Sequence, residues 1–187
     1  WQGRPNWLQL TIESLNLWWI IGYFGLLATW RFLTVIDYMP LGTAISVIIP
    51  FLFIAALAGL LLCIVGYVQA KATLYTITNK RVVMRIGAAL TITLNLPFTK
   101  IDNAAVAKKR GDFGNIAFET SGSTKFSYFV LWPHARSWHF GKPQPTLRCI
   151  PEIEKVSSIL GEAAKSRIIE KENHSQPNAP GVGVVAN

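Results

Sequence analysis

The chain has 187 residues, of which 51% are hydrophobic, and it carries a formal net charge of +8. The positive charge is unevenly distributed along the chain. From Gln69 onward there are 16 of the 18 Lys and Arg residues but only 8 acidic residues. An anionic bilayer attracts a tethered domain by about 1 kcal/mol per nearby basic residue. Because that tether explains the charge and no recognition motif is present, the composition argues against nucleic-acid binding.

Two long apolar runs dominate the N-terminal third, at residues 17–36 and 45–68. Each is long enough to cross a hydrocarbon layer of about 30 Å, which takes roughly 20 apolar residues in a helix. The connector, residues 37–44, is so short that the two helices must be antiparallel. Since the second run holds no charge, two buried helices of a soluble protein are the weaker alternative, and we expect a two-helix transmembrane hairpin.

The charges next to the hairpin predict its orientation. The connector holds Asp37 but no Lys or Arg. Basic residues follow the second run at Lys71, Lys80, Arg81 and Arg85. The positive-inside rule then places both termini, including the N-terminal segment 1–16, in the cytoplasm. Trp18 and Trp19 lie where an aromatic belt would mark the cytoplasmic interface.

Several residues of the hairpin are candidates for contacts within lipid. Arg31 lies about two turns short of the outer end, where it can reach outer headgroups, pair with Asp37 or meet a polar group of a partner. Small residues at four-residue spacing let another backbone approach closely, either that of the first helix, with its Gly22 and Gly25, or that of another protein. These small residues are Ala55, Gly59 and Cys63. Pro50 is expected to kink the second helix near its outer end.

After residue 68 the pattern changes to short strands. Stretches rich in β-branched residues at 72–78 and 81–86 predict a hairpin with its turn at Asn79-Lys80. Residues 90–96 predict a half-buried antiparallel strand that Pro97 ends, since apolar and polar residues alternate there. The apolar set of that strand is Leu90, Ile92, Leu94 and Leu96. Further strands are predicted at residues 101–108, 116–120 and 126–132.

The C-terminal part predicts a helix and a tail. Residues 133–145 form a connector rich in Pro and aromatic residues, and Pro151 opens a helix over residues 152–171 with apolar positions at helical spacing. Residues 173–187 lack an apolar face and predict a disordered tail. Strands followed by one helix suggest a small β-barrel or sandwich capped by that helix, here over residues 69–172. The expected fold class is therefore an α+β membrane protein.

Several motifs resemble those of a known family. The segment YTITNKRVV, residues 75–83, resembles the signature that follows two transmembrane helices in bacterial PH-domain membrane proteins. Further positions that match this family are WQGRP at 1–5, Gly87, LPFTKI at 96–101 and GNI at 114–116. A narrower resemblance, to photosynthetic complex assembly proteins of purple phototrophic bacteria, rests on LNLPF at 94–98, LWPHARSW at 131–138 and LRCIP at 147–151.

The resemblance extends from residue 1 to about residue 164. It implies a PH-like domain on the cytoplasmic side of the bacterial inner (intracytoplasmic) membrane, and a role in assembling the photosynthetic reaction centre with its light-harvesting 1 complex. The implied partners are reaction-centre subunits, light-harvesting 1 subunits and membrane lipids, with a homodimer left open. The alternative is a general membrane-anchored PH-like adaptor that binds anionic lipid or a peptide.

The residues do not indicate catalysis or a cofactor. Acidic residues are scattered, and neither a Ser-His-Asp spacing nor a phosphate-binding loop is present. His134, His139 and Cys149 fit no common metal-site spacing. No histidine falls within either apolar run, which excludes axial ligation of a pigment magnesium by histidine inside the bilayer. Cys63 and Cys149 are expected to lie in different environments as free thiols, which fits a reducing cytoplasm.

A partner-binding surface is the best candidate site. Trp and Arg dominate binding hot spots, and both types cluster in the connector region, although the two Trp residues there could instead close the core of a small domain. The candidates outside the membrane are Trp132, His134, Arg136, Trp138 and Arg148. The candidates in the hairpin are Trp18, Trp19, Gly22, Arg31, Ala55 and Gly59.

Overall fold

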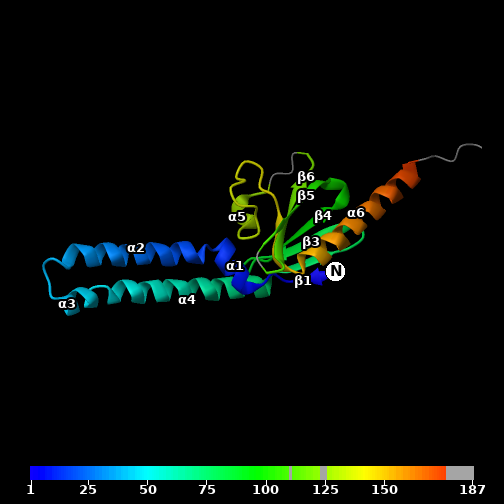
Figure 1. The fold of residues 1–187 in the computed structure, drawn as a ribbon. Coiled ribbons are helices and arrows are strands. Elements are labelled where there is room, and N and C mark those ends of the chain that lie inside the picture. Colours follow the sequence, from blue (N-terminus) through cyan, green and yellow to red (C-terminus); the bar gives the residue numbers. More distant parts are fainter. Residues whose placement is uncertain (110, 123–125, 176–187) are drawn as a thin grey trace, which may run out of the picture.

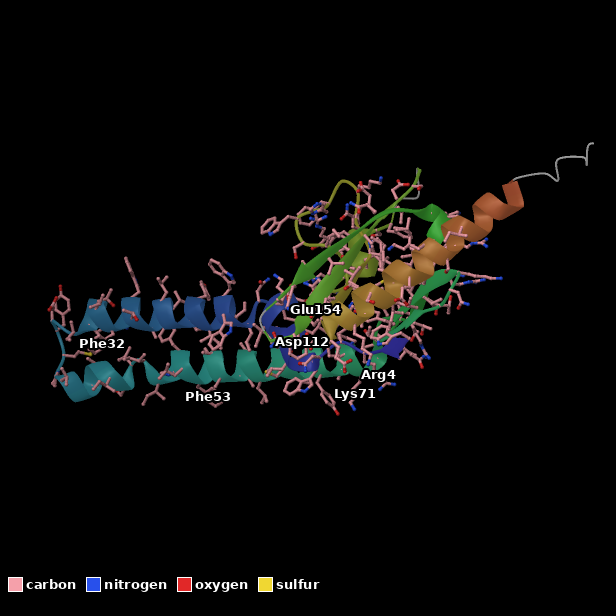
Figure 2. The ribbon with its side chains drawn as sticks, turned by 45° about the vertical axis from the view of Figure 1, so that its right-hand side comes forward. Arg4, Phe32, Phe53, Lys71, Asp112 and Glu154 are labelled. Carbon is pink, nitrogen blue, oxygen red and sulfur yellow. The ribbon has the colours of Figure 1, made fainter. Side chains whose placement is uncertain are left out.

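The computed structural model of the chain describes residues 1–109, 111–122 and 126–175. A long helical hairpin extends from one side of a β-rich body, and the C-terminal helix crosses the body and extends away from the other side (Figure 1). The side chains of the hairpin are largely apolar, as Phe32 and Phe53 illustrate, whereas the labelled charged residues lie on the body or where the hairpin meets it (Figure 2). The labelled charged residues are Arg4, Lys71, Asp112 and Glu154.

The hairpin begins with two helices that meet at an angle. Helix α1 spans Trp7–Ser14, and its N-cap Asn6 accepts hydrogen bonds from two backbone N–H groups of the first turn. Helix α2 spans Leu17–Val35, in close agreement with the predicted run. Between them Asn16 adopts a left-handed conformation with φ 54°, and the two helix axes differ in direction by 55°. Asn tolerates this conformation better than most residues, which explains the bend at this position.

The second half of the hairpin has different bounds from the predicted apolar run at residues 45–68. A short helix, α3, spans Leu41–Ser46, and α4 spans Ile49–Ala72, four residues beyond the predicted end. Pro50 lies in the first turn of α4, where its missing N–H has no intrahelical partner to lose. The predicted kink at Pro50 is therefore wrong, because the helix starts there after an interruption at Val47 and Ile48.

One stretch of the hairpin meets the length and composition criteria for a membrane-spanning helix by itself. The stretch Leu41–Ala72 is long and apolar enough to cross a bilayer. The pair α1 and α2 meets the same criterion only when the two bent helices count as one span. The helices α2 and α4 run side by side as a hairpin (Figure 1).

Small residues on α4 face the N-terminal helices. A Cβ added at Gly59 would lie 3.9 Å from Leu17 Cδ1, which is ordinary contact distance, so this glycine faces the start of α2. At Gly66 an added Cβ would overlap the side chain of Thr11 on α1. Added Cβ atoms at Gly22 and Gly25 would meet no described atom within 4 Å, so α4 packs on the first helix without close contact at these two glycines.

The β-rich body consists of two antiparallel sheets and helix α6. The first has strand order β1-β2-β3-β4 and the second β5-β6-β7. Helix α6, Ile153–Ser175, buries Ile153, Val156 and Leu160 in the core shared with both sheets, so its predicted apolar face is confirmed. The strands are β1 Gln2–Gly3, β2 Leu74–Ile77, β3 Arg81–Ile86, β4 Ile92–Pro97, β5 Ile101–Lys108, β6 Phe113–Thr120 and β7 Thr146–Pro151, with a 3₁₀ turn at Phe98–Lys100.

The structure differs from the sequence prediction at several places in the body. Residues 126–132 form no strand but a helical turn, α5, Tyr128–Leu131, which ends before Pro133. Strand β7 was not predicted, because all five of its residues before Pro151 are buried, so burial does not alternate along it, and because it contains the charged residue Arg148. Leu90 lies in the turn before β4 and is 81% exposed. The segment 1–16, for which no regular element was predicted, contains β1, which pairs with β2, and α1, which packs on α4 and β7. Of the predicted tail, residues 173–175 end α6 and residues 176–187 lie outside the described part.

Candidate functional site

A cleft lies where the hairpin meets the β-rich body. It has a volume of about 540 Å³ and is formed by the end of α1, the joint at Asn16, the start of α2, the α5 segment with the loop after it, and β7. Its lining residues are Glu13, Ser14, Asn16, Trp19, Tyr128, Trp132, Pro133, Ala135, Ser137, Trp138, Phe140 and Arg148. The cleft therefore brings together elements that are more than a hundred residues apart in the sequence.

Aromatic side chains form the walls of this cleft. Tyr128 and Phe140 pack with ring centroids 4.6 Å apart, and Trp138 meets the Phe140 ring edge-on at 6.3 Å. Trp138 is 85% exposed and Trp19 is 80% exposed. The loop thus exposes the large rings of Trp138 and Phe140, the latter 62% exposed, and exposed aromatic rings are typical of an interaction surface. The alternative that Trp138 closes the core is wrong.

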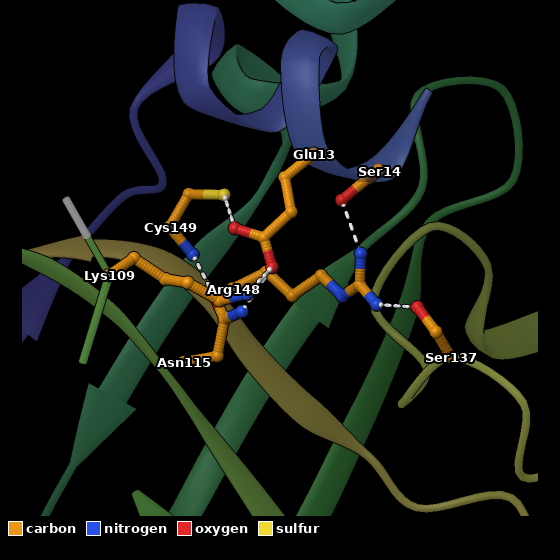
Figure 3. Close-up of polar contacts among 7 residues, drawn as sticks. All are labelled: Glu13, Ser14, Lys109, Asn115, Ser137, Arg148 and Cys149. Carbon is orange, nitrogen blue, oxygen red and sulfur yellow. Dashed lines mark hydrogen bonds and ion pairs between the residues drawn. The ribbon is translucent and has the colours of Figure 1, made fainter. Parts of the chain in front are cut away.

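Arg148 forms the floor of the cleft, and it is only 5% exposed. Its Nη1 donates to Ser14 Oγ at 2.7 Å and its Nη2 to Ser137 Oγ at 2.6 Å (Figure 3). Its Nε is buried without a partner among the described residues. No ion pair joins this guanidinium to a carboxylate in the described part of the chain. A buried cation without a counter-charge is costly, so the site is electrostatically prepared for an anion.

Glu13 lies beside Arg148 but is engaged elsewhere. Its carboxylate accepts a hydrogen bond from Asn115 Nδ2 at 2.5 Å and lies 3.5 Å from Lys109 Nζ (Figure 3). The Cys149 thiol also points to it, with Sγ 3.9 Å from Oε2. Burial, together with the Glu13 charge, raises the pKa of Cys149 to about 12, so this thiol is neutral and a poor nucleophile.

His134 does not belong to the surface. It is fully buried, with Nδ1 2.7 Å from the Tyr75 hydroxyl and Nε2 3.0 Å from Thr73 Oγ1. Burial, and then the Arg148 charge, lower its pKa to about 3, so the imidazole is neutral. The prediction that His134 contacts a partner is wrong, since it holds the loop of the cleft to the end of α4 and to β2.

Hydrogen-bond donors and acceptors assign the tautomer of this histidine. The Thr73 hydroxyl donates to Gln69 O at 2.8 Å, so it accepts from Nε2–H of His134. Nδ1 is then the acceptor for the Tyr75 hydroxyl, whose oxygen accepts in turn from the Arg148 backbone N–H at 3.2 Å. The chain Arg148–Tyr75–His134–Thr73–Gln69 thus uses each proton once and leaves no place for a second proton on the ring.

A second hollow adjoins the cleft along α2. This groove has a volume of about 430 Å³ and is lined by Trp18, Trp19, Gly22, Tyr23 and Leu26. Trp19 lines both hollows, so the aromatic cleft continues into an apolar groove on the helix surface. Four of the residues predicted from the sequence, Trp19, Trp132, Trp138 and Arg148, therefore meet in the cleft, and Trp18 and Gly22 line its extension.

The remaining predicted residues lie elsewhere. Arg136 donates from Nη1 to Gln144 Oε1 at 2.9 Å and lines a smaller hollow that Arg148 also lines. Arg31 is exposed toward the far end of α2, and the pairing with Asp37 does not occur among the described residues. Gly59 faces α2, and Ala55 lies one turn away on the same helix.

Comparisons with known proteins agree with this architecture. Residues 18–164 match the model of a family described as "Bacterial PH domain". The chain belongs to the bacterial PH domain family. It is also 40% identical over 190 residues to a protein of Rhodobacter capsulatus named "Uncharacterized 23.7 kDa protein in puhA 5'region", covering 100% of this chain and 88% of that protein. No solved structure matches the chain significantly.

Sequence reasoning missed part of the lining of this PH-domain cleft. Tyr128 and Phe140 are aromatic residues close in sequence to Trp132 and Trp138, so the aromatic character of this segment could have identified them as candidates. Ser14 and Ser137 gave no signal, since nothing in their neighbours shows that they hold a guanidinium. The described residues contain no group of three or more potential metal ligands. A cleft with aromatic walls, a buried cation and a protonated thiol behind it is suited to binding.

Proposed function

We propose that this PH-domain chain is a non-enzymatic membrane assembly factor for the photosynthetic reaction centre and its light-harvesting 1 complex, of the kind called PuhB. The observation that carries the proposal is the 40% identity, over the whole chain, to a protein named for its place in the 5′ region of puhA. Since puhA is a reaction-centre gene, this position favours a role in photosynthesis over a general adaptor. The motifs LWPHARSW and LRCIP, which carry the narrower resemblance, supply most of the cleft loop and β7.

The proposed anchor is the helical hairpin, crossing the inner membrane twice. The stretch Leu41–Ala72 supplies one crossing and the bent pair α1 and α2 the other. In this arrangement both termini and the β-rich body lie in the cytoplasm, because Lys71 and the basic residues of the body flank the inner ends of the helices. Trp18 and Trp19 then lie at the cytoplasmic interface, level with the cleft.

The proposed binding surface combines the cleft with the groove on α2. A reaction-centre or light-harvesting 1 subunit would place a membrane helix along α2 and a cytoplasmic segment against the rings of Trp132 and Trp138. Packing of helices in lipid and aromatic contacts outside it would both contribute. Because the exposed rings are few, we expect an affinity modest enough for release of the finished complex.

The experiment is complementation of a deletion strain in the phototrophic host. The strain would receive the wild-type chain or a double variant, Trp132→Ala with Trp138→Ala, which removes two rings from the cleft. We expect the double variant to accumulate at wild-type levels but to support several-fold less reaction centre, measured from near-infrared absorption of membranes. The control is Phe129→Ala, because this side chain is 89% exposed in the same segment but does not line the cleft.

Three results would count against the proposal or a part of it. A deletion strain with normal reaction-centre levels would contradict a role in assembly and favour the general adaptor. A tagged chain that purifies from phototrophic membranes without any reaction-centre or light-harvesting 1 subunit would contradict direct binding. A double variant indistinguishable from Phe129→Ala would place the contact outside the cleft.

A further inference from the structure

The cleft and the groove have the shape and chemistry of a site for an amphiphile. The cleft holds the buried guanidinium of Arg148, whereas the adjoining groove on α2 is lined by aromatic and apolar side chains. Because Trp19 lines both, a molecule with a polar end and an apolar tail could occupy them together. The site lies at the start of an apolar helix, which is where the headgroups of a bilayer lie if the proposed anchor is correct.

The polar end of the site is arranged for an anion. Ser14 and Ser137 each accept a hydrogen bond from Arg148, so each hydroxyl keeps its own proton for a further acceptor. Both serines line the cleft, and the Nε of Arg148 lacks a partner in the described part of the chain. The two serine hydroxyls, both polarised by the buried guanidinium, can therefore donate hydrogen bonds to the oxygen atoms of a phosphate.

The start of α2 adds to this field. No side chain of the described residues caps the helix, because Asn16 is in a left-handed conformation and its side chain makes no capping hydrogen bond. Asn16 and Trp19 both line the cleft, so the positive end of the helix dipole adjoins the same space. The carboxylate of Glu13 is offset by Lys109 at 3.5 Å, which leaves the charge of Arg148 as the net charge of the cleft.

We propose that this site binds one anionic phospholipid, with its phosphate at Ser14, Ser137 and Arg148 and an acyl chain along the groove on α2. The proposal rests on the membrane anchor of the proposed function. An anionic lipid such as phosphatidylglycerol is favoured over a zwitterionic one, because its phosphate is not offset by an amine of its own headgroup. The lipid would fill the space between the aromatic loop and α2.

The test uses the full chain, purified in a mild non-ionic detergent and washed free of lipid. Short-chain phosphatidylglycerol, short-chain phosphatidylcholine and inorganic phosphate are titrated separately, and bound lipid is counted by native mass spectrometry. We expect one phosphatidylglycerol per chain, at least tenfold weaker phosphatidylcholine binding and no response to inorganic phosphate at matched concentration. Equal binding of the two lipids, or an equal response to inorganic phosphate, would overturn the proposal.

Variants locate the lipid on the chain. Trp19→Ala opens the junction of the two hollows and should weaken phosphatidylglycerol binding at least tenfold. The matched control, Trp30→Ala, removes the same side chain from the same helix at a position that is 70% exposed and lies outside both hollows. Ser137→Ala removes one phosphate donor and should weaken binding of phosphatidylglycerol more than of phosphatidylcholine. Equal effects of Trp19→Ala and Trp30→Ala would refute this location.

The lipid site and the proposed function fail in different ways. A chain that stays membrane-bound and restores reaction centres, yet binds no phosphatidylglycerol, would refute the lipid site alone. A chain that alkaline carbonate extracts from membranes would refute the anchor and the lipid site with it. Loss of reaction centres in the Trp132→Ala and Trp138→Ala double variant, with unchanged lipid binding, would support both proposals, because the lipid contacts are placed on other residues.

Discussion

The buried histidine predicts a specific dependence of stability on pH. In the folded chain the pKa of His134 is lowered to about 3, mainly by burial, whereas an unfolded histidine titrates near 6.5. Below pH 6.5 the unfolded state therefore takes up a proton that the folded state does not. The sign follows: the stability is fully present above pH 6.5 and is lost as the pH falls, down to about pH 3.

The size of the effect follows from the same two values. Each pH unit below 6.5 costs about 1.4 kcal/mol while the folded imidazole stays neutral, so this one group removes about 2 kcal/mol between pH 7 and pH 5. The hydrogen-bond chain supports a folded state that resists protonation, since a proton on Nδ1 would turn it into a donor facing Tyr75, which already donates to it. A loss of this size lowers the melting temperature by roughly 4–8 °C.

The assay compares pH series of thermal unfolding for the full chain in detergent, followed by tryptophan fluorescence. His134→Gln is expected to be less stable at pH 7, because it disturbs a buried hydrogen-bond chain, but to lose about 2 kcal/mol less than the wild type between pH 7 and pH 5. The control is His139→Gln, because among the described residues the side chain of His139 bonds only to Ser137 O, and this variant should keep the wild-type dependence. If His134→Gln retains that dependence in full, the assignment of the neutral buried imidazole is refuted.

Two further predictions concern packing and reactivity. Gly66→Ala should destabilise the chain by about 1–3 kcal/mol in thermal unfolding, because the added methyl group overlaps Thr11. The control, Gly59→Ala, has ordinary contact distances and should change the stability by less than about 0.5 kcal/mol. Similar losses for both variants would contradict close packing of α1 on α4. In a Cys63→Ser background, Cys149 should resist maleimide in the folded chain and react after denaturation. The reason is that Cys149 is 1% exposed and that its pKa is raised to about 12. Rapid labelling of the folded chain would contradict the burial of this thiol.

Periodicity predicted the regular elements well. The strand at residues 101–108 has the predicted bounds, and the hairpin around Asn79-Lys80 pairs Tyr75 with Met84 in the expected antiparallel manner. Alternation identifies such strands because one face of each meets the core. The same reasoning missed β7, where burial does not alternate, and misread α5, because apolar residues before a proline suit a strand as well as a single helical turn.

The candidate site could be predicted by residue type but not by role. Trp and Arg residues were singled out because these types serve at interfaces, and four of them meet in the cleft. His134 was misassigned because nothing in its neighbours along the chain shows that Tyr75 and Thr73, about sixty residues earlier, supply its hydrogen bonds. Pairings of such long range depend on the completed fold, and a single sequence does not display them.

The connection from the return helix of the hairpin to the body is a single residue. Helix α4 ends at Ala72 and β2 begins at Leu74, and between them Thr73 is fixed to Gln69 and His134. Such a short and hydrogen-bonded connection restricts rotation of the body relative to α4. In the proposed membrane arrangement, a bilayer too thin for the Leu41–Ala72 stretch would tilt α4, and the tilt would be passed on to the first sheet. The orientation of the body toward a neighbouring complex would then vary with membrane thickness.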